Sequence, residues 1–156
     1  MKYFTYDWWF GENVLDYDPS VKYWEYYDSI KNSLPHMVRT FVDEINLHDS
    51  RELELERDVK NNSILIKLLT YKYDENFSSD SQFVIHILYS DVSEFAIFDN
   101  EIESNLIEFD PNDDLGYDEF EMLGGDITAH RLLFSSGIEI RVNFRGFSYS
   151  VGDVFI

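Results

Sequence analysis

The chain has 156 residues, of which 44% are hydrophobic and 17% aromatic, and its formal net charge is -19. This length is sufficient for one hydrophobic core, and the aromatic content separates the chain from acidic, aromatic-poor disordered proteins. We therefore expect a single domain spanning residues 1–156. A negative charge of this size repels phosphate backbones and anionic lipids, which argues against direct binding to nucleic acid or membranes.

The absence of cysteine excludes disulfides, thiolate zinc sites and cysteine nucleophiles. No run approaches the roughly 18 apolar residues that a membrane-spanning helix needs, and the first residues lack the long apolar segment of a signal peptide. On these grounds we predict a cytoplasmic protein.

The first elements in chain order are an aromatic segment and two helices. We interpret the aromatic segment, residues 3–10, as a strand or coil that covers the core, and an exposed partner-binding patch is the alternative. Asp18 before Pro19 is an N-cap followed by proline, and apolar residues then recur every three or four positions, which predicts a helix over 19–33. A second helix, with Ser33 as its expected cap, ends near residue 47.

From residue 51 onward the apolar residues alternate with polar ones, which is typical of strands. Residues 51–57, a turn at Asn61-Asn62 and residues 63–73 predict a hairpin. After Gly146 the apolar phase slips by one residue, which predicts a bulge. The other expected strands are residues 82–92, 95–98, 131–134 and 138–144. This order of elements predicts an α+β fold, with the two N-terminal helices packed on a mostly antiparallel sheet of about five to seven strands.

Residues 109–121 carry acids at nearly the spacing of an EF-hand calcium loop. The required glycine comes one residue late, at Gly116, and Gly124-Gly125 opposes the helix that should leave such a loop. We interpret the segment as a solvated acidic loop and keep calcium, the one cofactor that the pattern suggests, as an alternative. The candidate metal ligands are Asp110, Asn112, Asp114, Asp118 and Glu121.

The segment between Lys72 and Arg131 contains no lysine or arginine and holds 16 of the 31 acidic residues. Apolar residues interleave with these acids, so we expect the apolar side chains to anchor the segment while the carboxylates face solvent. A surface of one sign attracts a basic partner, although the same charges can serve solubility alone. The predicted partner-binding residues are Asp99, Glu101, Glu103, Asp110, Asp113, Asp114, Asp118, Glu119 and Glu121.

Catalytic patterns are weak. The four histidines are not spaced as a zinc pair, and the chain lacks a nucleophile elbow, a phosphate loop and a dinucleotide fingerprint. We expect His48 to serve a helix end, and His86 and His130 to lie in strands. No catalytic residue is predicted, which favours a protein without enzymatic activity.

Three short motifs carry a resemblance: Met1-Lys2-Tyr3-Phe4-Thr5, the helix around residues 24–27 leading to Leu34-Pro35, and His48-Asp49. They resemble a family of small bacterial proteins with a domain of unknown function, which implies no reaction. In size and composition, the acidic segment and the strands around residues 130–144 look like acidic immunity proteins of bacterial toxin systems.

Three hypotheses follow. The first is a non-enzymatic protein-binding domain that neutralises a basic protein such as a toxin, as the immunity proteins do. The second is a divalent-cation-binding protein or metal-assisted hydrolase that uses residues 110–121. The third is an acidic housekeeping domain whose charges maintain solubility. The oligomeric state is left open by the sequence.

Overall fold

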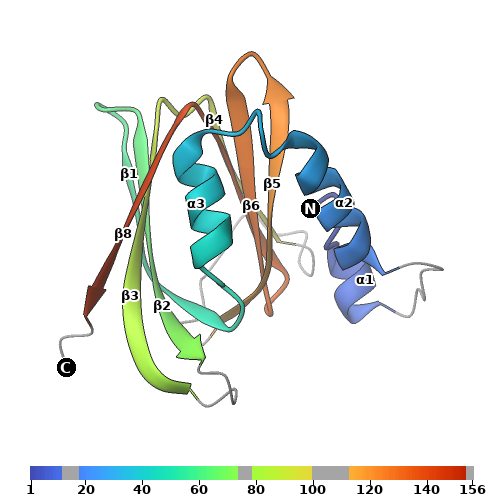
Figure 1. Cartoon of the computed structure of the whole chain (residues 1–156). Helices are drawn as coiled ribbons and strands as arrows, with labels where there is room; N and C mark the ends of the chain where they lie inside the picture. The colour runs from blue at the N-terminus through green and yellow to red at the C-terminus, as the bar shows by residue number, and fades with distance from the viewer. Residues whose placement is uncertain (12–17, 74–78, 100–112, 154–156) are drawn as a thin grey trace.

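The computed structural model describes residues 1–11, 18–73, 79–99 and 113–153. In these ranges, three helices gather on one side of a curved antiparallel sheet (Figure 1). The helices are α1 (Tyr6–Phe10), α2 (Pro19–Ile30) and α3 (His36–Glu44). The strands are β1 (Ser50–Asp58), β2 (Ser63–Tyr73), β3 (Ser79–Ser90), β4 (Glu94–Asp99), β5 (Asp114–Gly124), β6 (Ile127–Phe134), β7 (Ile138–Phe144) and β8 (Gly146–Asp153).

The fold mixes helices with an antiparallel sheet, as predicted, but the sheet is larger than five to seven strands. The eight described strands form one sheet in the order β4-β7-β6-β5-β1-β2-β3-β8. Strand β5 lies where the sequence predicted an acidic loop. Its pairing with β6 shifts register between Leu115 and Tyr117 and again between Met122 and Gly124, so its apolar residues do not keep the period of two that identifies a strand.

The helices largely follow the sequence prediction. Asp18 caps α2 by accepting a hydrogen bond from the backbone N–H of Ser20 at 2.9 Å. The expected cap of the second helix is wrong, because α3 begins after Pro35 without a side-chain cap. The aromatic segment contains a short helix, α1, rather than a strand or coil. Among the described residues, no helix is long and apolar enough to cross a membrane.

The sheet turns a corner between its two halves, β4-β7-β6-β5 and β1-β2-β3-β8. Strands β7 and β8 lie far apart in the strand order, although only Arg145 separates them in the chain. Pairing continues through this corner, since Ser90 lies opposite Gly146 and the Arg145 N–H donates to the Asp91 carbonyl at 3.3 Å. A Cβ at Gly146 would lie 2.1 Å from Ser90 Oγ, so a larger residue there would require the Ser90 side chain to rotate away. The phase slip at Gly146 coincides with this corner, whereas the predicted bulge is not found in the pairing of β3 with β8, which has no register shift.

The core fills the space between the two halves of the sheet and α3. Phe41 of α3 packs edge-on against Phe120 of β5 and Phe147 of β8, with ring centroids 6.0 and 5.3 Å apart. All three side chains are buried. Each such ring contributes about 1.5–3 kcal/mol through burial. These contacts place α3 against both halves of the sheet.

Helix α2 covers an exposed edge of β5. Strand β5 pairs with β1 only at Ser50 and Arg51, so most of this edge has no neighbouring strand. Two hydroxyls of α2 replace it: the Phe120 N–H donates to Tyr23 Oη at 2.9 Å and the Met122 N–H to Tyr26 Oη at 3.1 Å. These two hydrogen bonds satisfy N–H groups of β5 and hold α2 beside the strand, and a cavity lies between the two elements.

Candidate functional site

A cavity of about 400 Å³ lies between α2, α3, the connection that follows α3 and the first half of β5. Its walls are largely aromatic, with Tyr23 and Trp24 from α2, Phe41 from α3 and Tyr117 from β5. Trp24 is 50% exposed, so it stands at the mouth, while Tyr23 and Phe41 are buried. No lysine or arginine lines the cavity among the residues that the structure describes. Among the described residues, the site is therefore a concave aromatic surface without a lysine or arginine.

The wall around Tyr117 is built by the N-terminal segment. Phe4 stacks on the Tyr117 ring at 4.9 Å, and Trp8 and Trp9 meet the ring edge-on at 5.2 and 5.1 Å. A Cβ at Gly116 would lie 2.0 Å from the Trp9 ring, so glycine allows α1 to approach β5. The aromatic segment that the sequence predicted to cover the core thus forms one wall of the cavity.

Asp118 is the carboxylate of the cavity, and a buried histidine holds it. His130 is fully buried, and its Nε2 lies 2.9 Å from Asp118 Oδ2 while its Nδ1 lies 2.7 Å from Tyr89 Oη. Phe120 stacks on the imidazole at 3.9 Å. Burial, and secondly the Asp118 charge, raise the pKa of Tyr89 well above its usual range, so its hydroxyl keeps a proton to donate.

This proton arrangement orients the carboxylate. With the Tyr89 O–H donating to Nδ1, the imidazole donates from Nε2 to Asp118 Oδ2. The other oxygen, Oδ1, has no hydrogen-bond partner within the described ranges, and the Asp118 side chain is 27% exposed. One carboxylate oxygen thus accepts a hydrogen bond from the buried His130, and the other can accept a hydrogen bond from a ligand in the cavity.

Two further carboxylates lie at the Tyr117 side of the cavity. Burial raises the pKa of Tyr117, and the negative charges of Asp18 and Asp49 raise it further. His48 contacts β5, with Nδ1 2.5 Å from the Gly116 carbonyl oxygen, instead of serving the end of α3 as predicted. The Nε2 atom of the same ring lies 3.6 Å from Asp49 Oδ1. The polar groups around the cavity therefore favour a positively charged ligand.

Two predicted partner-binding residues, Glu119 and Asp113, are buried and accept hydrogen bonds from other parts of the chain. Glu119 is 1% exposed and accepts backbone N–H groups of the N-terminal segment, from Tyr3 at 2.9 Å, Phe4 at 3.3 Å and Lys2. Asp113 is 5% exposed and accepts from Ser135 Oγ at 2.7 Å. The expectation that these carboxylates face solvent is wrong for both residues, because several donors compensate their burial.

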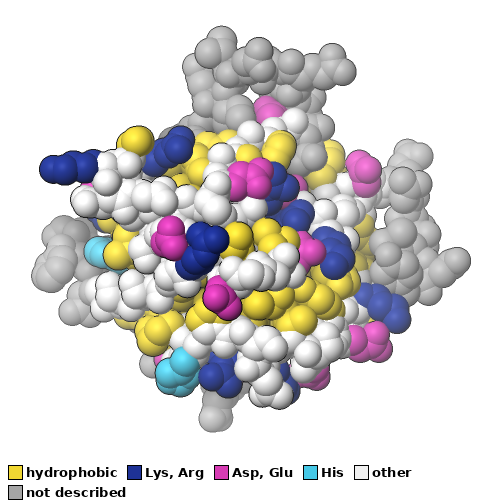
Figure 2. All heavy atoms as spheres, turned by 90° about the horizontal axis from the view of Figure 1, so that it is seen from above, with side chains coloured by type: hydrophobic (Ala, Val, Ile, Leu, Met, Phe, Trp, Pro, Cys, Tyr) yellow, Lys and Arg dark blue, Asp and Glu magenta, His cyan; other side chains and the backbone are white. Residues whose placement is uncertain are grey.

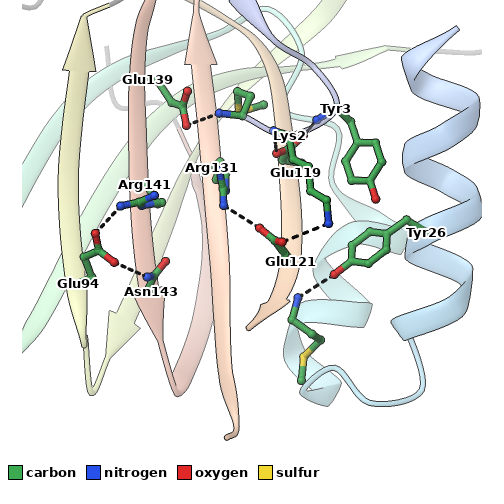
Figure 3. Close-up of polar contacts among 12 residues, drawn as sticks. Lys2, Tyr3, Tyr26, Glu94, Glu119, Glu121, Arg131, Glu139, Arg141 and Asn143 are labelled. Atoms are coloured by element: carbon green, nitrogen blue, oxygen red, sulfur yellow. Dashed lines mark hydrogen bonds and ion pairs between the residues drawn. The ribbon is translucent and has the colours of Figure 1, made fainter. Parts of the chain in front are cut away.

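Glu121 belongs to an ion-paired network on the opposite face of β5 (Figure 3). Arg131 Nη2 lies 2.7 Å from one Glu121 oxygen, and Lys2 Nζ lies 3.3 Å from the other. Farther along this face, Arg141 pairs with Glu94. The charge of Glu121 is therefore largely compensated within the fold.

The remaining predicted partner-binding residues are placed as follows. Asp114 is exposed at the start of β5, and Asp99 ends strand β4. Glu101, Glu103 and Asp110 lie outside the described residues. Of the predicted set, only Asp118 among the described residues lines the cavity.

The geometry of β5 does not match the calcium loop that was the alternative interpretation of this segment. Asp114 and Glu121 are seven residues apart on an extended strand, which separates their Cα atoms by about 20 Å. Asp118 and Glu121 also point to opposite faces, whereas calcium ligands converge within about 2.6 Å of the ion. Asp110 and Asn112 lie outside the described residues. No group of three metal-ligating side chains occurs in the described ranges.

The described charges are unevenly compensated. Seen from above, acidic and basic side chains are interspersed around an exposed apolar area (Figure 2). Ion pairs such as Lys31–Asp28 at 2.8 Å and Arg145–Asp91 at 3.5 Å fit this mixture. Asp7 of α1 and Asp43 of α3, in contrast, are exposed and have no ion-pair partner in the described part of the chain.

Comparisons with known proteins give no functional assignment. No family model matches the chain, and no curated protein matches it. Among solved structures, the crystal structure of an uncharacterized protein from Neisseria gonorrhoeae is similar, with a TM-score of 0.45 and 13% sequence identity. The alignment covers 67% of this chain and 93% of that chain.

Proposed function

We propose that this chain is a non-enzymatic protein-binding domain that captures a basic partner protein through its helical side. The observation that carries the proposal is an aromatic cavity with the carboxylate of Asp118 in its lining and those of Asp18 and Asp49 near Tyr117, in a chain of net charge -19. Basic toxins, such as nucleases with a positively charged cleft, are partners of this chemistry, and neutralising one would make the chain an immunity protein.

The charge of the helical side supports this choice of surface. Residues 18–49 contain six carboxylates and three basic residues. Two of the three bases are already paired, since Lys22 lies 3.2 Å from Glu25 and Lys31 lies 2.8 Å from Asp28. Unpaired carboxylates accelerate the encounter with a positively charged protein, and this effect weakens as salt screens the charges.

Exposed apolar side chains on the same side favour a protein partner. Val21 and Trp24 are one helical turn apart on α2, and their exposed fractions are 53% and 50%. Phe10 of α1 is 47% exposed. An apolar contact area with a charged rim is the usual composition of a protein interface.

The test is affinity capture from a lysate of the source cell, followed by measurement of association rates for the retained protein. In the variant Asp7→Asn/Asp43→Asn, we expect association at low ionic strength to slow by about 3- to 10-fold. The matched control is Asp91→Asn/Asp126→Asn, which removes the same charge from two turn positions. Both have positive φ, 50° and 64°, which asparagine tolerates.

A basic partner whose association slows with salt and with the helical-side variant, but much less with the control, supports the proposal. Equal slowing by both variants would show that only the net charge matters. The absence of a basic protein on the column at low and moderate salt would overturn the proposal in favour of charges that maintain solubility.

A further inference from the structure

We infer that the cavity between α2, α3 and β5 binds the side chain of a lysine that the partner inserts, with the ammonium group on Asp118 and the alkyl chain between Trp24 and Tyr117. This inference rests on the proposed function, because it names the group of the basic partner that the cavity recognises. It goes beyond a charged surface in specifying one buried contact.

The aromatic walls suit an alkyl chain that ends in a cation. The electron-rich faces of Trp and Tyr attract a cation within about 6 Å of the ring centroid, and their apolar area packs against methylene groups. Trp24 stands half-exposed at the mouth, and the stacked pair Phe4–Tyr117 forms the wall of the cavity on the side of α1. A neutral aliphatic side chain would use the walls and leave the Asp118 carboxylate without a partner.

The position of Asp118 favours an ammonium over a guanidinium group. Arginine binds carboxylates best through two parallel hydrogen bonds, which require both oxygens. His130 already occupies one of the two acceptor sites of Asp118 Oδ2, so Oδ1 is the less engaged oxygen. An ammonium group is a compact charge that one oxygen can satisfy, and Asp118 is the carboxylate in the cavity lining among the described residues.

The support behind Asp118 makes the contact a rigid one. His130 is fully buried, sandwiched against Phe120 and hydrogen-bonded to Tyr89. The carboxylate therefore does not need to be ordered when a ligand binds, which lowers the entropic cost of binding. A solubilising carboxylate has no need of such a support.

The first experiment uses a side-chain analogue and no partner. ¹H–¹⁵N NMR spectra of the full chain are recorded during titration with n-butylammonium chloride, with 1-butanol as the uncharged analogue of the same length and n-propylguanidinium as the arginine analogue. We expect saturable shifts of the Trp24 and Asp118 amides with n-butylammonium. Weaker binding is expected for the guanidinium and no saturation for the alcohol.

Four variants locate the binding energy. Asp118→Asn keeps an acceptor for His130 but removes the charge, and should weaken n-butylammonium binding at least about 10-fold. Trp24→Leu, at a half-exposed position, should weaken it about 2- to 5-fold, whereas Trp24→Phe retains a π face and most of the affinity. Asp126→Asn removes one charge roughly 20 Å along the β5–β6 hairpin and should change the affinity less than about twofold.

The outcomes separate this inference from the proposed function. Binding that is unchanged in Asp118→Asn, or equal for n-butylammonium and 1-butanol, would overturn the lysine site. A basic partner could still be captured and dissociate equally fast from the parent chain and from the variants Asp118→Asn and Trp24→Leu. In that case the proposed function would stand and the lysine contact would be refuted. Saturable n-butylammonium binding without any captured protein would overturn the proposal of a basic protein partner. The cavity would then be an ammonium site for a small molecule.

Discussion

A half-buried glutamate, Glu52, should make the stability of this protein fall as pH rises from about 4.5 to about 7. Glu52 of β1 lies opposite the fully buried Leu68, so it points to the inner face of the sheet, and its Oε2 has no hydrogen-bond partner among the described residues. Burial, and secondly the negative charge of Asp113, raise the pKa of Glu52 to about 7. We predict that Glu52→Gln stabilises the protein above pH 7.

The size and sign of the effect on the free energy of unfolding follow from this pKa. Against an ordinary value of 4.5, a folded-state pKa of about 7 sets an upper limit of about 3 to 4 kcal/mol, at ~1.4 kcal/mol per pH unit. The carboxylate is partly exposed, and solvent screening reduces the expected effect to about 1–2 kcal/mol. From pH 4.5 to about 7 the unfolded chain has released this proton while the folded protein still holds it. The free energy of unfolding therefore falls with rising pH across this window and is lowest above it.

The assay is urea unfolding of the parent chain and of Glu52→Gln at several pH values between about 4.5 and 8. Glutamine resembles the protonated carboxyl, so the variant should lose this part of the pH dependence: its advantage is about 1–2 kcal/mol near pH 8 and disappears near pH 4.5. Glu56→Gln removes the same formal charge from an exposed position on β1 and reports the effect of net charge. Identical pH profiles for the two variants would refute the reasoning.

Three further substitutions test the packing around the cavity. Gly116→Ala places a methyl group 2.0 Å from the Trp9 ring, so we expect a loss of about 1–3 kcal/mol and a changed near-UV CD spectrum; an unchanged spectrum would contradict the close approach. Glu119→Ala leaves backbone N–H groups without their buried acceptor and should lower the free energy of unfolding, measured in urea, by about 3 kcal/mol. A loss below about 1 kcal/mol would contradict this role of Glu119. His130→Leu leaves the Tyr89 hydroxyl unpaired and should cost about 2–3 kcal/mol, part of which Tyr89→Phe restores in the double variant; no restoration would refute this pairing.

The elements that the sequence predicted well are those that neighbouring residues specify. Asp18 and Pro19 mark the start of α2 because a cap and its helix lie within one turn. The β1–β2 hairpin follows from alternation and from Asn62, which adopts a φ of 50° that asparagine tolerates. The slip at Gly146 was visible as a change of phase, although its cause, a corner between two halves of the sheet, is a tertiary feature.

The cavity could not be predicted because its parts come from distant segments. Its aromatic wall joins Phe4 to Tyr117, and its carboxylate depends on a histidine twelve residues away and a tyrosine on another strand. The role of Glu119 depends on N–H groups more than 110 residues away. A count of acids along the chain shows neither which carboxylates are buried nor which are paired. It therefore identified Asp118 for its charge and missed the support that distinguishes it.

The two proposals act over different distances, which has a kinetic consequence. Exposed carboxylates such as Asp7 and Asp43 attract a basic partner over roughly the Debye length, about 8 Å at physiological salt, and so determine mainly the association rate. Asp118 is partly shielded inside an aromatic cavity and interacts only after contact. Its loss should therefore change mainly the dissociation rate, with a weaker dependence on salt. Association rates and dissociation rates measured for the same complex thus report separately on the charged surface and on the cavity.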